Sequence, residues 1–275
     1  MVELPREMRI KQRDHWSCRR CGKKFEDLVI CQHVYPATSD DHFITLCNKC
    51  IDWAFDNPSE AVIECEKLLR RNKIVLIGDC HGNFERLNTV LTDEMPFDFF
   101  LSVGDVGTLR DVTPDNINII DRWQDKGHFV FGNHDNCWFF NQLALHQDIN
   151  GVSVAGLNGM LKSRTFLKEQ PNNISFREIM YLSHLNDIDI LVTHQPPTGM
   201  FDNAGEFILE ELLNYLVPKI YISGHIHKYK LKFHLNTFMI SLPMITNGYA
   251  VAYFQGRDLR DLEVVMKKGR RYVRI

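Results

Sequence analysis

The sequence contains no apolar run that approaches the roughly 18 residues needed to span a bilayer. Its first residues, MVELPREMRIKQRDHW, lack the apolar core of a signal peptide. We therefore expect a cytoplasmic protein that does not enter a membrane. A strong net charge is also absent: the formal value is −3, so the whole protein is not a polyanion-binding cation. In a reducing compartment, its eight cysteines are expected to bind metal or to remain free thiols.

Length and composition allow more than one domain. The 275 residues suffice for one large domain, or for a small module and a domain of about 200 residues. The content of 44% hydrophobic and 24% charged residues is ordinary for a soluble globular protein. Basic residues gather between Arg6 and Lys24 and again between Lys267 and Arg274. Each cluster is either a solvated surface or a docking patch for the phosphate backbone of a nucleic acid.

Two cysteine pairs lie near the start of the chain, Cys18-x2-Cys21 and Cys47-x2-Cys50. Two such pairs supply the four thiolates of a tetrahedral structural zinc site. The alternative is four free thiols, which a basic and partly exposed segment would leave prone to oxidation. We predict one structural Zn²⁺ in a module of residues 1–56. Because this module is too small to bury much apolar surface, the metal would supply folding energy.

The residues that lead to the second pair, VICQHVYPATSDDHFITLCNKC, resemble an HNH endonuclease finger, at most over residues 10–55. The resemblance implies a zinc-stapled ββα unit in which His33 matches the general-base histidine. Gln32 stands where the family has a metal-binding Asp or His, His42 stands at the Asn position, and Ile51 replaces the last His. Two catalytic metal ligands are therefore missing. We expect an inactive finger that binds nucleic acid or docks.

A connecting helix is predicted over residues 57–72. Apolar residues recur at helical spacing from Asn57 to Arg71, with Ser59 as the N-cap and Pro58 just outside the helix. The main domain would then occupy residues 73–275.

Within the main domain, five apolar runs end in a small residue followed by metal-ligand side chains. The runs are KIVLIGDCHGN with Asp79 and His81, FDFFLSVGDVG with Asp105, HFVFGNHD with Asn133, DIDILVTHQPP with His194, and KIYISGHIH with His225 and His227. Helical spacing over 84–91, 116–124 and 206–216 separates several of them. Strands that alternate with helices predict an α/β fold whose functional groups gather at the carboxyl ends of a largely parallel sheet. Aspartate and histidine there suit a transition-metal site.

The motifs GDCHGN, GDV, GNHD, TH and GHIH occur in the order of the calcineurin-like metallophosphoesterase superfamily and resemble it over roughly residues 73–255. The resemblance implies a four-layer α/β/β/α sandwich with two divalent metal ions. Mn²⁺ is the expected ion, and Fe or Zn²⁺ are alternatives. The resemblance also implies which residues bind each ion: Asp79, His81 and His227 the first, Asn133, His194 and His225 the second, with Asp105 bridging both.

The same resemblance implies phosphoester hydrolysis by a metal-activated hydroxide. His134 would donate a hydrogen bond to a phosphoryl oxygen or a proton to the leaving group, and Asp135 would orient it. Cys80, between two ligands, is expected to be a packing residue and not a nucleophile.

Departures from the family patterns narrow the choice of substrate class. The Ser/Thr protein phosphatases continue their second motif as GD-x-VDRG, whereas this sequence reads GDVGTLRD, with Thr108 at the second Asp. The THQPPTGMFD and GHIH segments look more like the family's phosphodiesterases and broad-specificity phosphoesterases. We therefore predict a phosphodiesterase that acts on nucleic acid or nucleotide. The alternatives are a phosphomonoesterase or protein phosphatase, and a non-catalytic nucleic-acid-binding protein that works through the zinc finger.

Two further expectations concern the rest of the main domain. Asn158 and Gly159 follow a strand and are expected in a loop over the site. After Tyr229 the alternating runs KLKF, TFMISL, YAVAYFQ, LEVVMK and RYVRI predict strands of the second sheet of the sandwich and its edge.

Overall fold

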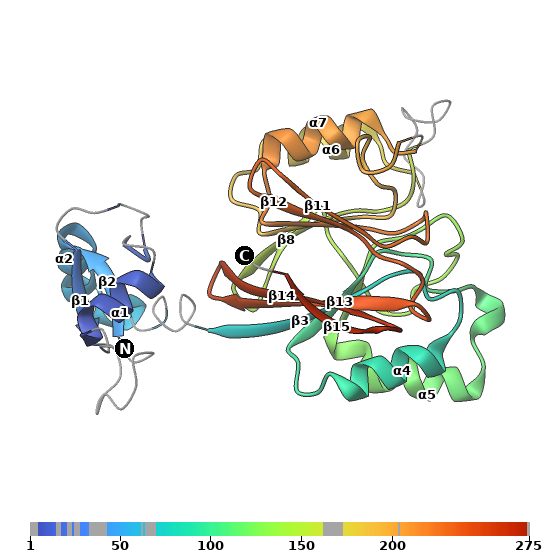
Figure 1. The fold of residues 1–275 in the computed structure, drawn as a ribbon, viewed down its shortest axis with the longest axis horizontal. Coiled ribbons are helices and arrows are strands. Elements are labelled where there is room, and N and C mark those ends of the chain that lie inside the picture. Colours follow the sequence, from blue (N-terminus) through green and yellow to red (C-terminus); the bar gives the residue numbers. More distant parts are fainter. Residues whose placement is uncertain are drawn as a thin grey trace. The chain divides into compact units, whose positions relative to one another are not determined.

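The computed structural model describes residues 5–14, 18–20, 24, 28–32, 43–61, 63, 70–161, 173–202 and 204–273. The chain divides into two compact units, Met1–Arg71 and Asn72–Ile275 (Figure 1). We call them the N-terminal unit and the main unit. No helix in the described part of the chain is long and apolar enough to cross a membrane.

The N-terminal unit has a small core that includes cysteines. Helix α1 (Arg6–Arg13) precedes strand β1 (Leu28–Gln32), which pairs antiparallel with β2 (Phe43–Cys47), and α2 (Asn48–Asp56) follows directly. The buried apolar residues of this unit among those described are Ile10, Cys18, Ile44, Leu46, Cys47 and Cys50.

The predicted connecting helix begins earlier than expected. Pro58 is already helical, and the N–H of Ala61 donates to the Asn57 carbonyl oxygen at 2.9 Å. Asn57 therefore precedes the first turn in place of Ser59. Proline is well tolerated in the first helical position, because its missing N–H would have no partner in the helix. Residues 64–69 of this predicted helix lie outside the described residues.

Two sheets packed face to face form the centre of the main unit. Among the described residues, one sheet has seven strands in the order β15-β14-β13-β3-β4-β5-β6, and the other has six in the order β11-β12-β10-β9-β8-β7. The strands of the first sheet that precede the C-terminal hairpins are β3 (Arg71–Ile77), β4 (Phe99–Ser102), β5 (Gly127–Phe129) and β6 (Asn141–Gln142). The second sheet contains β7 (His146–Ile149), β8 (Val152–Leu157), β9 (Ile190–Thr193), β10 (Ile220–Ser223), β11 (Lys230–His234) and β12 (Thr237–Ser241).

Helices cover the outer face of each sheet. In Figure 1, α4 (Phe84–Asp93) and α5 (Pro114–Trp123) lie on the seven-stranded sheet, and α6 (Phe176–Leu182) and α7 (Phe207–Leu216) lie on the six-stranded sheet. Two short 3₁₀ helices, η2 (Leu109–Asp111) and η3 (Gln124–Lys126), flank α5. The predicted four-layer α/β/β/α sandwich is confirmed.

The central strands are apolar throughout because they are buried on both faces. Along β3, Ile74 and Leu76 face the core between the sheets, whereas Val75 and Ile77 face the core under α4 and α5. Successive strand residues point to opposite faces, so a strand between two apolar layers needs a continuous apolar run.

The sheet assignment of the last three strands is wrong in the sequence analysis. Only β11 and β12 join the second sheet, while β13 (Gly248–Gln255), β14 (Asp258–Met266) and β15 (Gly269–Val273) extend the first sheet beside β3. Alternating hydrophobicity indicates a strand and its buried face, but pairing with a distant strand depends on the whole fold.

A buried carboxylate ties β15 to the rest of the first sheet. Glu94, just after α4, accepts a hydrogen bond from the Tyr249 hydroxyl at 2.6 Å and pairs with Lys73 at 2.9 Å and with Arg270. Burial alone would raise the pKa of Glu94. The hydrogen bonds and the two cations outweigh burial, and the pKa lies below its ordinary value of 4.5.

Candidate metal centre

Loops after strands of both sheets meet at one place. The N–H groups of Cys80 and His81, after β3, donate to the carbonyl oxygen of Asp105, after β4, at 3.0 and 2.8 Å. The Gly224 N–H, after β10, donates to the His194 carbonyl oxygen, after β9, at 3.0 Å. The carboxyl ends of these strands therefore bring the predicted ligands together, as expected for an α/β sheet.

The backbone of this region is strained. His81, Asp105, His225 and His227 all have positive φ, between 47° and 65°. Residues other than glycine rarely adopt this left-handed backbone conformation, which costs of order 1–3 kcal/mol per residue. Such strain persists only where the surrounding structure imposes it, and it gathers at functional sites.

One group consists of Asp79, His81, Asp105 and His227, whose ligand atoms all lie within 4.8 Å of one another. His227 Nε2 lies 2.8 Å from Asp79 Oδ2 and 3.0 Å from His81 Nε2. Asp79 Oδ1 is buried and has no hydrogen-bond partner among the described residues. Buried oxygens seldom lack a partner, and a cation at this group would satisfy both the carboxylate and the facing imidazole nitrogens. The residues present therefore fit a divalent metal ion.

Burial and neighbouring charges shift the pKa values of two residues in this group. Burial raises the pKa of Asp79 to about 7, and the neighbouring charge of Asp105 adds to this rise although His194 opposes it. Burial and then the charge of His81 lower the pKa of His227. A bound cation would favour the carboxylate of Asp79 and the neutral imidazole of His227.

A second group adjoins the first. Asn133 Oδ1 lies 3.0 Å from His194 Nε2 and 3.1 Å from His225 Nδ1, and His194 Nε2 lies 3.5 Å from Asp105 Oδ2. The Nδ1–H of His194 donates to the Val103 carbonyl oxygen at 2.8 Å. This hydrogen bond sets the tautomer, because it leaves the Nε2 lone pair free to bind a metal. The structure thus brings all seven predicted ligands into two groups that meet at Asp105.

Comparison with known proteins agrees with these motifs. The sequence matches the calcineurin-like phosphoesterase family over residues 72–229, more than half of the chain. The chain belongs to this family. It is therefore a phosphoesterase, a metal-dependent hydrolase of phosphoester bonds with a candidate Asp/His metal site.

A solved structure shares the fold of this phosphoesterase. The protein TT1561 of Thermus thermophilus superposes with a TM-score of 0.53 at 15% identity, over 70% of this chain and 98% of that chain. A conserved protein of Streptococcus pneumoniae, described as a predicted phosphoesterase, is 13% identical over 74% of this chain and 98% of its own, with a TM-score of 0.43. No curated protein matches this chain in sequence.

The two predicted catalytic residues of the phosphoesterase differ in their surroundings. The side chain of His134 is exposed, and its ring centroid lies 5.4 Å from that of His81. The backbone N–H of His134 donates to Asp105 Oδ1 at 2.8 Å. The buried carboxylate of Asp135 accepts from the N–H groups of Asp105 and Gly132, both at 2.8 Å. Asp135 therefore holds the loops after β4 and β5 together. Its role in orienting the His134 ring stays a prediction.

Two glycines that the sequence analysis did not assign make room for the carboxylates. A Cβ at Gly132 would lie 2.1 Å from Asp105 Oδ1, and one at Gly224 would lie 2.2 Å from Asp79 Oδ1. Neither position has room for a larger residue. The sequence does show a glycine before the ligands in GNHD and in GHIH. It does not show which atoms each glycine makes room for, because those atoms belong to distant segments of the chain.

Asn158 directly follows β8 and is buried, and the place of its loop over the site stays a prediction. Its Oδ1 accepts from the Phe131 N–H and its Nδ2 donates to the Leu143 carbonyl oxygen, each at 3.0 Å. It thereby supports the segment just before Asn133. Cys80 is also buried, and burial raises the pKa of its thiol, which suits the predicted packing residue.

A third group lies in the N-terminal unit. The sulfur atoms of Cys18, Cys47 and Cys50 lie within 4.8 Å of one another, and all three residues are buried. Cys21, the fourth predicted zinc ligand, lies outside the described residues, as do His33 and His42 of the HNH-like pattern. The resemblance to an HNH finger therefore stays a prediction.

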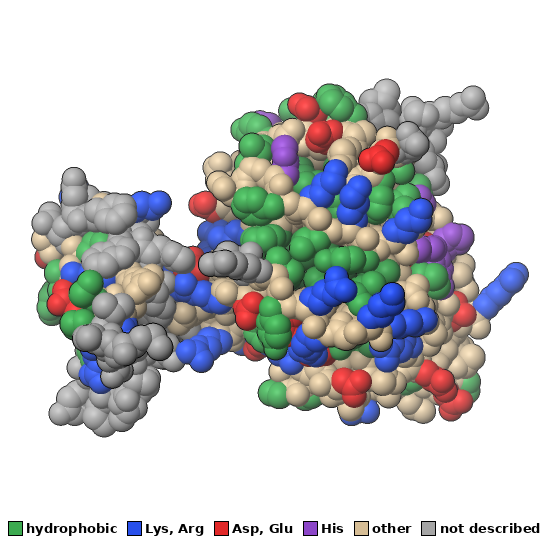
Figure 2. Space-filling model, viewed as in Figure 1, with side chains coloured by type: hydrophobic (Ala, Val, Ile, Leu, Met, Phe, Trp, Pro, Cys, Tyr) green, Lys and Arg blue, Asp and Glu red, His purple; other side chains and the backbone are tan. Residues whose placement is uncertain are grey.

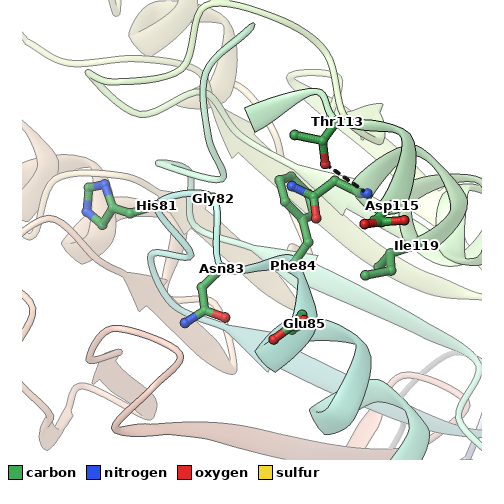
Figure 3. A pocket seen from close by; sticks show the side chains of 9 residues that line it. His81, Gly82, Asn83, Phe84, Glu85, Thr113, Asp115 and Ile119 are labelled. Carbon is green, nitrogen blue, oxygen red and sulfur yellow. Dashed lines mark hydrogen bonds between the residues drawn. The ribbon is translucent and has the colours of Figure 1, made fainter. Parts of the chain in front are cut away.

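A pocket of about 560 Å³ begins at His81 (Figure 3). It lies between the first turns of α4 and α5. Its other lining residues are Gly82, Asn83, Phe84, Glu85, Thr113, Asp115, Asn116 and Ile119.

Proposed function

We propose that this phosphoesterase works with two divalent metal ions. The first would be held by Asp79, His81 and His227, the second by Asn133, His194 and His225, with Asp105 shared. The position of Asp105 carries the proposal: its Oδ2 lies 3.8 Å from His81 Nε2 on one side and 3.5 Å from His194 Nε2 on the other. One carboxylate oxygen between two imidazoles of different groups suits a bridging ligand.

The chain's own residues would orient the phosphoryl group and move a proton. Divalent ions, with Mn²⁺ expected and Fe or Zn²⁺ as alternatives, would supply polarisation of the phosphoryl oxygens and a lowered pKa for the attacking water. The His134 imidazole is exposed beside His81 and can donate to a phosphoryl oxygen or to the leaving group. Asp135 would keep His134 in place by holding its loop against that of Asp105.

We propose a phosphodiester of a nucleic acid or nucleotide as the substrate. The motif GDVGTLRD supports this over a protein phosphatase, because Thr108 stands where those enzymes have Asp. Its hydroxyl donates to Asp111 at 2.9 Å, within the turn of η2. Figure 2 shows Lys and Arg side chains on the face that carries β11 to β15 and histidines gathered at one edge of the main unit. Lys228, Lys267 and Arg271 are exposed. Such cations would attract a polyanionic substrate.

The test compares two chromogenic esters. The Mn²⁺-loaded protein should hydrolyse bis-p-nitrophenyl phosphate with a higher kcat/KM than p-nitrophenyl phosphate. The Asp105→Asn variant, purified in the same way, shows whether a contaminant contributes. Faster turnover of the monoester would contradict the preference for diesters and favour a phosphomonoesterase.

For the N-terminal unit we propose one structural Zn²⁺ on Cys18, Cys47 and Cys50, with Cys21 as the fourth ligand predicted from the sequence. Three buried thiols within 4.8 Å support a zinc site, since thiolates bind Zn²⁺ tightly and a small unit gains stability from it. Cys50→Ser should lower the zinc content measured by mass spectrometry. Cys137→Ser, outside the unit, is the matched control. Full zinc content in Cys50→Ser would contradict the proposal.

Nucleic acid is the proposed partner of this zinc unit. The strand, strand, helix order of β1, β2 and α2 is the order of the HNH-like finger, and the segment from Arg6 to Lys24 is basic. Fluorescence anisotropy with labelled single- and double-stranded DNA tests this. Binding should weaken steeply between 50 and 200 mM salt, as counterion release requires, and should weaken in Cys50→Ser. Equal binding by the variant would assign the contact to another part of the chain.

A further inference from the structure

The pocket that begins at His81 has an apolar side. Buried Phe84 and half-buried Ile119 contribute to its wall, and Figure 3 shows both between Asn83 and Asp115. His81 stands at one end, apart from the helix residues. A volume of about 560 Å³ lies within the range of sites that bind small organic molecules. A phosphoester whose phosphate reaches the metal centre would therefore have space for an organic group beside it.

The charge of the pocket is negative. Its nine lining residues, all described, include no Lys or Arg, but they include the exposed carboxylates Glu85 and Asp115. These two residues come from different helices, α4 and α5, and lie in the first turn of each. An anionic group would enter this pocket against two negative charges.

The two helix N-termini do not reverse this preference. A free N-terminus attracts anions through its unpaired N–H groups and the helix dipole. Here the Asn83 side chain accepts from the Arg86 N–H at 3.1 Å, and the Thr113 hydroxyl accepts from the Asn116 N–H at 3.3 Å. The acidic residue in each first turn offsets the dipole as well. Both helix ends are therefore capped and neutralised by their own residues.

The wall that joins α5 to the His81 loop is fixed by Asp111. Its carboxylate accepts from the Thr108 N–H at 2.7 Å, and its carbonyl oxygen accepts from the Asn116 side-chain amide at 2.7 Å. A Cβ at Gly82 would lie 2.6 Å from Asp111 Oδ1, so this side chain packs against the loop that carries His81. The pocket is thus pre-formed and needs little ordering to bind a ligand.

We infer that this pocket binds the organic group esterified to the phosphate, and that it selects a neutral or cationic group over an anionic one. The inference rests on the proposed function and deepens it. If the substrate is a nucleotide or nucleic acid, the pocket takes a nucleoside, with its flat base and hydroxyls, and the next phosphate of the chain lies outside it. Esters whose organic group places a carboxylate or a second phosphate inside this pocket are poor substrates.

Three phosphonates of similar chain length test the charge preference. 2-Aminoethylphosphonate carries a cation, 2-hydroxyethylphosphonate is neutral, and 3-phosphonopropionate carries an anion at the same end. As competitive inhibitors of chromogenic ester hydrolysis by the Mn²⁺-loaded protein, they should bind in that order, the amine most tightly. Titration calorimetry with the same ligands gives Kd as a second readout that needs no turnover.

Variants of the two carboxylates locate the effect. In Glu85→Gln with Asp115→Asn, the Kd of each charged ligand should change by about fivefold per carboxylate, the effect of unit charges 4 Å apart in water. Because the two ligands change in opposite directions, the ratio of the anionic to the cationic Kd should fall by about 30-fold per carboxylate. Asp115→Lys together with Glu85→Gln should make the anion the preferred ligand. Asp121→Asn is the matched control, because Asp121 is exposed on the same helix and does not line the pocket.

The outcomes separate this inference from the proposed function. If the protein hydrolyses the chromogenic esters but binds all three phosphonates equally, the pocket is not the site of the organic group, and the proposed function stands. The same holds if the double variant keeps the wild-type ratio of Kd values. If the folded, metal-loaded protein hydrolyses neither ester and binds none of the phosphonates, both are overturned.

Discussion

Gly224 lies directly before His225, and its lack of a side chain leaves room for Asp79. A Cβ at this position would lie 2.2 Å from Asp79 Oδ1 and 2.5 Å from Val103 Cγ2, whereas ordinary contacts begin at 3.4 Å. In Gly224→Ala the Asp79 carboxylate must therefore move by about 1 Å, because close-packed interiors yield little. Since the φ of Gly224 is not positive, alanine adds no backbone strain and the effect is steric.

A displacement of this size should be costly. A 1 Å misplacement of a catalytic group can lower the rate by about 100-fold. We expect Gly224→Ala to lose about that factor in kcat/KM for the preferred chromogenic ester. The metal content of the main unit, measured by mass spectrometry after Mn²⁺ loading, should fall as well, because Asp79 is a proposed ligand.

The control for this experiment is Gly269→Ala at the first residue of β15, just after the turn from β14. Its φ is +123°, so alanine strains the backbone, but no atom lies within 4 Å of the added Cβ. This variant should lose thermal stability and keep its kcat/KM and metal content. If Gly224→Ala folds and retains the wild-type rate and metal content, Asp79 does not hold a metal and the first group is misassigned.

Three other substitutions test separate parts of the molecule. Asp105→Asn should abolish phosphoester hydrolysis while leaving zinc in the N-terminal unit; measurable hydrolysis by the purified variant would refute the shared ligand. His134→Ala should lower kcat by about 100-fold or more and change KM little, as expected for a proton donor; an effect on KM alone would make it a binding residue. Glu94→Gln should lower the free energy of unfolding by about 2 kcal/mol at pH 7, because it removes the buried carboxylate that pairs with Lys73 and one of the two carboxylates that pair with Arg270, which keeps Glu263. The pKa of Glu94 is below 4.5 in the folded protein, so its contribution is complete above that pH and is lost as pH falls. Urea unfolding from pH 7 to pH 3 should therefore show the wild type and Glu94→Gln converging, and a constant difference would rule out this carboxylate as the cause.

Local patterns explain why the strand ends were predicted correctly. A strand buried on both faces must be apolar without interruption, so β3 stands out in the sequence, and Asp79 and His81 follow it. The helix N-cap was harder to place. Both Asn57 and Ser59 can cap a helix, and only the hydrogen bond from Ala61 decides for Asn57.

Long-range pairing explains what the sequence patterns missed. Apolar and polar residues alternate along β13 to β15 as they would in strands of either sheet. The place of these strands beside β3 depends on partners far away in the chain. The same is true of Asn158, which bonds to Phe131 and Leu143, and of Gly224, which makes room for Asp79. No local pattern records which distant atom a small or polar residue will meet.

The sequence by itself determined the chemistry, because the types and order of its ligand residues at five strand ends are those of a calcineurin-like phosphoesterase. The tertiary structure decided how these residues are combined. It placed one oxygen of Asp105 between two histidine groups, and it brought Glu85 and Asp115 from different helices to one pocket beside His81. The distances between these side chains, and the electric field that their charges create, exist only after the elements that carry them have packed together.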